Sequence, residues 1–213
     1  MFYDTITLKG DNTMYTIADK LSQTLQNQGV INKEEQDICR YGLELAFLSV
    51  CEFASILLLA IFVGNFMQTL TFFIAFIPLR LYAGGYHADT RGRCYLVLLG
   101  VYFAFAYAMK VTPIFLYQMV EIATIIFMLF MVFCFAPIIH RNKKVTDIER
   151  YHYRKISLII MAIEVGIIIF GMIFCTIKQY VFAFSLGQFT VAVSMLAALV
   201  KIRRGGERNE RFS

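Results

Sequence analysis

A cysteine, a histidine and several arginines lie close together in residues 80–94, which read RLYAGGYHADTRGRC. A cysteine acts as a nucleophile only as its thiolate, and nearby positive charge, a helix N-terminus or a histidine that accepts the proton favours that form. Residues 80–94 can supply all three, with His87 as the candidate base and Cys94 as the candidate nucleophile. We therefore treat residues 80–94 as the candidate catalytic segment.

A helix is expected to begin at the end of this segment. The apolar run that starts at Tyr95 predicts the helix, and Asp89 or Thr90 is a suitable N-cap residue for it. Cys94 would then lie near the N-terminus of the helix, which is the positive end of the helix dipole. The neighbouring arginine side chains add further positive charge. Both features favour a thiolate.

The spacing of the two candidate catalytic residues limits this prediction. Seven residues of straight helix rise roughly 10 Å, which is too far for an imidazole to hydrogen-bond a thiol. Gly84 and Gly85 allow backbone turns that other residues cannot adopt just before His87. The chain from His87 to Cys94 must fold back, with Gly92 as an aid, or the two side chains must meet across two protomers.

A solvated interfacial histidine and an inert cysteine at a helix start would be the ordinary alternative. Against that alternative stands a resemblance. The segment resembles the AgrB family, the accessory gene regulator membrane peptidases of Gram-positive quorum sensing, in five residues: Arg80, Gly84, Gly85, His87 and Cys94. The similarity in size and hydrophobic layout extends over nearly the whole chain.

The resemblance implies a cysteine endopeptidase of the cell membrane. Its substrate would be a small AgrD-like precursor peptide, which loses its C-terminal part and is closed into a thiolactone or lactone ring. Cys94 would attack a backbone carbonyl with His87 as general base, while Arg80, with Gly84 and Gly85, would bind substrate or stabilise the oxyanion. The family also implies a homodimer. The sequence contains no P-loop, zinc-protease motif or Asp-rich metal site, so we expect no cofactor.

A different class of function stays open on the sequence alone. The same layout of apolar segments suits a non-catalytic peptide exporter or a membrane binding partner, with residues 80–94 as a binding gate. Cys94 discriminates between the two classes, because only a peptidase needs its thiol.

The composition is typical of an integral membrane protein in a lipid bilayer. Hydrophobic residues make up 59% of the 213 residues and charged residues only 16%, whereas soluble domains are about 25% charged. We expect a single domain over residues 1–213, with an interfacial region at 1–40, a membrane region at 41–200 and a tail at 201–213. The net charge of +5 gives no case for a nucleic-acid partner. No Cys or His spacing suggests a metal site.

The apolar periodicity predicts an all-α fold. An amphipathic helix is expected within the first 28 residues, where it would lie at the membrane interface or guide an amphipathic peptide. About six hydrophobic segments follow, at residues 41–65, 66–79, 95–109, 114–139, 156–177 and 180–200. The second and third look short for a span of roughly 20 residues. They flank the candidate segment, so we expect it at the headgroup layer, with these two helices short or partly re-entrant.

The lysines and arginines predict the orientation in the membrane. If all six segments are followed in order, 18 of the 20 Lys and Arg residues fall on one side, leaving only Lys110 and Lys178 opposite. The positive-inside rule then places both termini and the candidate segment in the cytosol.

Glu44, Glu52 and Glu164 are acidic residues inside apolar segments. Glu164 should face the protein interior, be protonated, or pair with a cation. Glu44 and Glu52 fall on one face of a helix and, like Asp89, are candidates to orient His87. No residue stands out as the third catalytic group.

Overall fold

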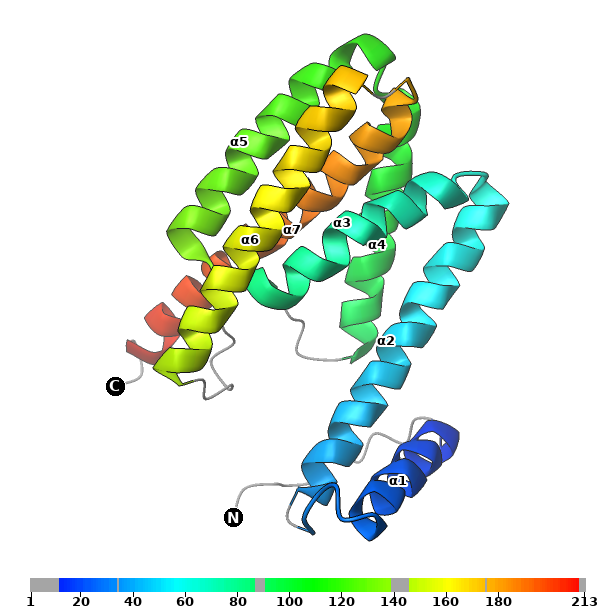
Figure 1. The fold of residues 1–213 in the computed structure, drawn as a ribbon, viewed down its shortest axis with the longest axis vertical. Coiled ribbons are helices and arrows are strands. Elements are labelled where there is room, and N and C mark those ends of the chain that lie inside the picture. The colour runs from blue at the N-terminus through cyan, green and yellow to red at the C-terminus, as the bar shows by residue number, and fades with distance from the viewer. Residues whose placement is uncertain (1–11, 34, 87–90, 139–145, 175, 211–213) are drawn as a thin grey trace. The chain divides into compact units, whose positions relative to one another are not determined.

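The chain folds into helices. The computed structural model describes residues 12–33, 35–86, 91–138, 146–174 and 176–210. Within those ranges there is no β-strand, and the helices are α1 (Asn12–Asn27), α2 (Gln36–Val63), α3 (Phe66–Ala83), α4 (Arg91–Val111), the short η1 (Ile114–Leu116), α5 (Tyr117–Phe135), α6 (Asp147–Phe174) and α7 (Lys178–Glu210) (Figure 1). Six helical segments there, from α2 to α7 with η1 joined to α5, are long and apolar enough to cross a membrane. The predicted all-α membrane fold is confirmed.

The chain divides into two compact units, Met1–Ile56 and Leu57–Ser213. In the first unit, α1 ends where the sequence predicts. Gly29 adopts a positive φ of 71°, the Val30 N–H donates to the Leu25 carbonyl at 3.0 Å, and the Gly29 N–H donates to the Gln26 carbonyl at 2.9 Å. This is the pattern of a Schellman C-cap. Glu35 then accepts a hydrogen bond from the Asn32 N–H at 3.0 Å, which is one half of a capping box before α2.

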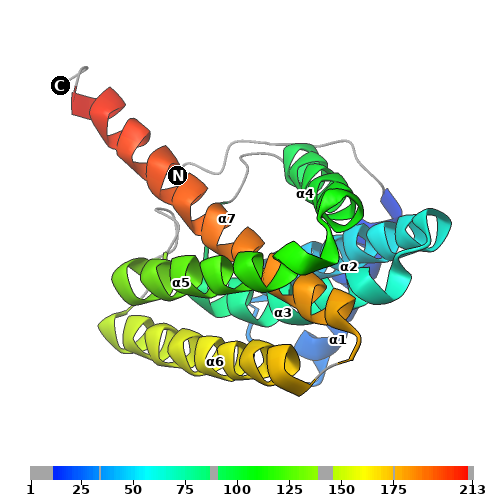
Figure 2. The same ribbon diagram turned by 90° about the horizontal axis from the view of Figure 1, so that it is seen from above.

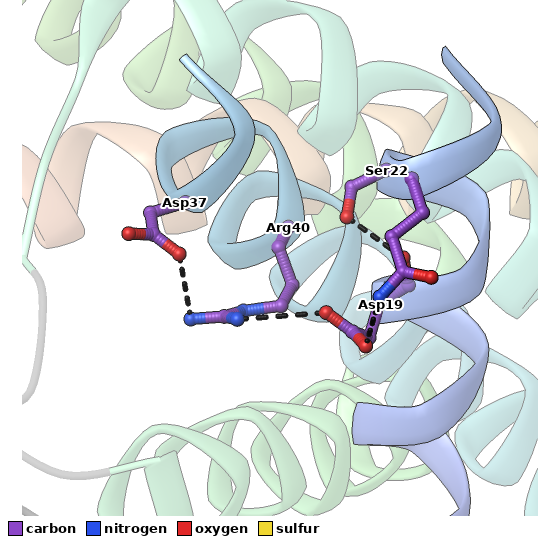
Figure 3. Close-up of polar contacts among 5 residues, drawn as sticks. Asp19, Ser22, Asp37 and Arg40 are labelled. Carbon is purple, nitrogen blue, oxygen red and sulfur yellow. Dashed lines mark hydrogen bonds and ion pairs between the residues drawn. The ribbon is translucent and has the colours of Figure 1, made fainter. Parts of the chain in front are cut away.

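Polar contacts join α1 to the start of α2 within this unit (Figure 3). The Arg40 guanidinium lies 3.0 Å from Asp37 on its own helix and 3.5 Å from Asp19 on α1. Of the predicted apolar stripe on α1, Ala18 is buried, while Ile17 and Leu21 are 51% and 40% exposed. Exposed apolar side chains are compatible with a helix at the membrane interface, which remains a prediction.

Helix α7 packs against α3, α5, α6 and α4 in the second unit. Figure 2 shows α4 and α6 on opposite sides of α7. Gly187 makes the contact with α3 close, because a Cβ there would lie 2.6 Å from the Phe72 carbonyl oxygen and 3.0 Å from the Ala75 Cβ. On the α5 side, the rings of Tyr117 and Phe182 stack at 4.0 Å. Helix α7 is therefore the helix against which the other helices of the second unit pack, including α3 and α4, which flank the candidate segment.

The two segments expected to be short are longer helices than their apolar runs. Helix α3 has 18 residues and continues past Leu79 to Ala83, and α4 has 21 residues and begins at Arg91. Both meet the length and composition of a membrane span. A helix end is fixed by where its backbone hydrogen bonds stop, and the polar Arg80 can occupy the last turn of α3 without interrupting them.

Helix α6 also begins earlier than its apolar run. The apolar segment predicted here begins at residue 156, but α6 starts at Asp147. A capping box explains this start, because the Thr146 N–H donates to the Glu149 carboxylate at 2.8 Å and the Glu149 N–H donates to the Thr146 hydroxyl at 3.3 Å. His152 therefore lies exposed on a helix, and α7 likewise continues through most of the predicted tail, to Glu210.

Glu164 faces the protein interior, as one of the sequence alternatives required. It is 4% exposed, and its carboxylate accepts a hydrogen bond at 3.0 Å from the side-chain amide of Gln188, which is fully buried on α7. This pair joins α6 to α7 through polar atoms inside an apolar span.

The pair predicts a difference between two substitutions of Glu164. Glu164→Gln keeps an acceptor for the Gln188 amide and should leave Tm in detergent unchanged. Glu164→Leu leaves that amide buried without an acceptor, at a cost of about 1 kcal/mol, so Tm should fall by roughly 2–4 °C. Ile163→Leu, at a 58% exposed position, is the control. Equal melting of the Leu and Gln variants of Glu164 would contradict a stabilising contact.

Candidate active site

The last turn of α3 carries Arg80, whose side chain turns back onto the chain that follows the helix. Its Nη2 donates a hydrogen bond to the Tyr86 carbonyl oxygen. Its Nη1 is buried and has no hydrogen-bond acceptor among the described residues. Arg80 therefore holds the backbone just before His87, while its Nη1 has no acceptor in the described part of the chain.

Gly84 and Gly85 turn the backbone after α3, as their sequence predicts. Their φ angles are +80° and +144°, a region that residues with a Cβ rarely adopt. The Ala83 carbonyl accepts the Ile138 N–H at 2.9 Å, and a Cβ on Gly84 would collide with the Ile138 backbone. A Cβ on Gly85 would overlap Arg80 Nη1 and the Ser194 hydroxyl. Glycine is thus required at both positions, because a Cβ would clash with neighbouring atoms and because the φ angles disfavour other residues.

Helix α7 fixes Tyr86, the residue directly before His87. The Tyr86 N–H donates to the Ser194 carbonyl at 2.9 Å and to the Ser194 hydroxyl at 3.1 Å. The Lys201 Nζ lies 5.2 Å from the centroid of the Tyr86 ring, within the range of a cation–π interaction. Ser194 and Lys201 of α7, together with Arg80 of α3, therefore hold Tyr86.

Cys94 is the fourth residue of α4 and lies in its first turn. The first four N–H groups of a helix have no partner within the helix, and they make its N-terminus electropositive. The thiol is partly buried and interacts electrostatically with the Arg80 guanidinium. The end of α3 and the start of α4 therefore bring a positive charge to the candidate nucleophile.

The structure brings four of the predicted site residues into one region, namely Arg80, Gly84, Gly85 and Cys94. His87 and Asp89 lie outside the described residues, as does the predicted cap at Thr90. Glu44 and Glu52 belong to α2 in the first unit, so their role in orienting His87 remains a prediction. The described residues contain no group of three or more His, Cys, Asp or Glu side chains that could hold a metal ion.

Sequence reasoning missed Ser194 and Lys201. Ser194 is 108 positions from its partner Tyr86, and neither residue belongs to a local motif. A signal does exist in the helical period, because Gly187, Ser194 and Lys201 are seven residues apart and fall on one face of α7. That face is the one that meets α3 at Gly187.

The electrostatic interaction between Arg80 and Cys94 leads to a prediction about the reactivity of the thiol. Arg80→Gln should slow alkylation of Cys94 by iodoacetamide at neutral pH by roughly threefold to tenfold, because a neighbouring cation favours the thiolate by on the order of 1 kcal/mol. Arg80→Lys keeps the charge and should stay close to the original rate. Peptide mapping by mass spectrometry measures each thiol separately, so exposed Cys134 is an internal control, and Arg203→Gln controls for loss of charge elsewhere. An unchanged Cys94 rate in Arg80→Gln would contradict the electrostatic link.

Comparison with known proteins decides the family. Residues 15–196 match the family described as Accessory gene regulator B. The chain belongs to the AgrB family. AgrB proteins take part in the processing of quorum-sensing peptides and act with AgrD-like precursor peptides. With its six candidate spans, this chain is a multi-pass membrane protein of that family.

Individual relatives agree with this membership. An AgrB-like protein 2 of Clostridium perfringens strain 13 is 26% identical over 171 residues, which cover 76% of this chain and 77% of the relative. An AgrB-like protein of Clostridium perfringens strain SM101 is 24% identical over 200 residues, covering 90% and 87%. Protein FsrB of Enterococcus faecalis is 29% identical over 98 residues, covering 46% and 40%. No solved structure matches this chain.

Proposed function

We propose that this AgrB protein is a membrane cysteine endopeptidase that cleaves an AgrD-like precursor and promotes its cyclisation. The observation that carries the proposal is the place of Cys94 in the first turn of α4, where it interacts electrostatically with the Arg80 guanidinium. The Arg80 guanidinium also donates to the Tyr86 carbonyl, directly before His87. Positive charge, a helix N-terminus and a histidine are the three features that activate a thiol.

The first half of the reaction cleaves the peptide. His87 takes the proton of the Cys94 thiol, and the thiolate sulfur attacks a backbone carbonyl carbon of the precursor. The resulting oxyanion needs donors, and the unused Nη1 of Arg80 is one candidate, with the precursor's acidic C-terminal region as its other candidate ligand. When the C–N bond breaks, His87 returns the proton to the leaving amine, and an acyl thioester remains on Cys94.

The second half closes the ring. A Cys or Ser side chain upstream in the bound peptide attacks the thioester carbonyl, and the Cys94 sulfur leaves as thiolate, which regenerates the enzyme. Exchange of one thioester for a thiolactone is close to balanced, so the energy of the acyl group is retained until cyclisation. A nucleophilic cysteine suits this sequence of steps better than a serine would. Water must be excluded meanwhile, and a site at the headgroup layer would help to exclude it.

Two further features belong to the same proposal. The distribution of Lys and Arg supports a topology with both termini and residues 80–94 in the cytosol, where a newly made precursor would be. Membership of the family supports a homodimer. A monomer in detergent that retains full activity would overturn the dimer without affecting the chemistry.

Intact-mass spectrometry tests the proposed function. The purified protein is incubated with an AgrD-like precursor peptide, and the expected result is a covalent adduct equal in mass to the N-terminal part of the peptide. Fragmentation should place the adduct on Cys94, and prior alkylation of Cys94 should prevent it. A precursor that binds without adduct or cleavage would overturn the peptidase function and support a carrier.

A further inference from the structure

We propose that Ser194 of α7 is a positioning residue for catalysis, because it anchors the backbone at Tyr86, the residue directly before His87. The proposal rests on the proposed function, in which His87 and Cys94 react together. Ser194 touches neither reacting group. It acts through Tyr86, whose N–H donates to both the carbonyl and the hydroxyl of Ser194, at 2.9 and 3.1 Å.

The two main-chain polar groups of Tyr86 are held by different helices. Its N–H is held by Ser194 on α7, and its C=O accepts from Arg80 Nη2 on α3. That carbonyl belongs to the peptide bond that joins Tyr86 to His87, so its orientation sets the direction in which the chain enters His87. The Tyr86 N–H belongs to the preceding peptide unit, so Ser194 and Arg80 together hold the backbone on both sides of the Tyr86 Cα.

The register of α7 supports this role for Ser194. Gly187 fixes α7 against α3 by close approach to Phe72 and Ala75. Ser194 lies two helical turns further along the same face, where it meets Gly85 and Tyr86. Lys201 lies another two turns along and approaches the Tyr86 ring. One face of α7 therefore carries Gly187, which packs against α3, together with Ser194 and Lys201, which contact Tyr86.

Other hydroxyl side chains on α7 show what an ordinary helical serine does. The Ser185 hydroxyl donates to the Phe182 carbonyl at 2.8 Å, and the Thr190 hydroxyl donates to the Leu186 carbonyl at 2.8 Å. These bonds stay within the helix, as is usual for Ser and Thr. The Ser194 hydroxyl instead accepts a bond from a distant segment. Ser185, buried on the same helix, is therefore a matched control.

The experiment compares Ser194→Ala, Ser194→Thr and Ser185→Ala by two readouts. The first is the kinetics of precursor cleavage in lipid nanodiscs. Ser194→Ala should lower kcat by about fivefold to tenfold, as expected for one lost hydrogen bond, and leave KM unchanged. Ser194→Thr retains the hydroxyl and should stay within about twofold of the original kcat, as should Ser185→Ala. Equal kcat values for the two alanine variants would overturn the proposal.

The second readout needs no activity. Hydrogen–deuterium exchange of the peptide that contains Tyr86 should be faster in Ser194→Ala, because the Tyr86 N–H loses one of its two acceptors and keeps only the main-chain carbonyl. We expect no change in Ser185→Ala and recovery in Ser194→Thr. A fall in kcat without faster exchange at Tyr86 would overturn the positioning role. If the parent protein proves unable to cleave the precursor, the proposed function fails, and with it the catalytic role of Ser194. Exchange would then still decide whether Ser194 anchors the segment.

Discussion

Replacing Cys94 by alanine is expected to reduce precursor cleavage by at least roughly a thousandfold, because the proposed acyl-enzyme forms on the Cys94 sulfur. The loss should appear in kcat, since the precursor still meets the same membrane and the same Arg80. The measurement is the rate of peptide release followed by mass spectrometry. Cys134→Ala is the matched control, because Cys134 is an exposed cysteine on α5 and has no role in the proposal.

Two outcomes would contradict the mechanism. Cleavage at the original rate by Cys94→Ala would remove the covalent route. A variant that still moves intact precursor across a vesicle membrane, while neither it nor the parent cleaves, would favour the exporter. Cys94→Ser adds a finer test, because a serine hydroxyl is a weak nucleophile near neutral pH. We expect no thioester in that variant and only trace cleavage.

The sequence predicts those parts of the site that depend on local backbone chemistry. Two adjacent glycines mark a turn wherever they stand, and both adopt positive φ angles here. The apolar run after residue 94 predicts a helix, and α4 contains Cys94 in its first turn. Local pattern is sufficient for such features, because neighbours in the chain determine them.

Contacts between distant segments were not predictable in the same way. Ser194 looks like any other small residue of an apolar helix, and its contact with Tyr86 follows only from the register of α7 against α3. Helix ends were misjudged for a related reason. Arg80 is polar, so the apolar run stops before it, yet α3 continues to Ala83 and uses the guanidinium to hold the backbone beyond its own end.

This arrangement explains why an arginine is placed in the last turn of a membrane helix. Its charge interacts electrostatically with the Cys94 thiol, and its planar group donates to the Tyr86 carbonyl. A lysine could supply the charge but lacks the rigid fork of N–H donors. Arg80 therefore serves two requirements of the proposed chemistry. It favours the Cys94 thiolate, and it holds the backbone directly before the proposed base, His87.

Gly85→Ala is expected to reduce cleavage by about a hundredfold or more, the scale of loss that a 1 Å displacement in an active site produces. A Cβ at this position would overlap Arg80 Nη1 and the Ser194 hydroxyl, and φ of +144° is strained by about 1–3 kcal/mol for a residue other than glycine. The chain must relieve both by shifting Gly85, Arg80 or Ser194. Each of these shifts would weaken the contacts that hold Tyr86, so the backbone directly before His87 would no longer be fixed.

The matched control is Gly100→Ala in α4, where a Cβ would meet nothing within 4 Å. Alanine there should stabilise the helix by about 0.5–1 kcal/mol and leave cleavage unchanged. Rates are compared per folded molecule, with Tm measured in the same detergent, so that a loss of folding is separated from a loss of geometry. If Gly85→Ala folds and cleaves like Gly100→Ala, then the close packing of Arg80, Gly85 and Ser194 is not what aligns the catalytic residues.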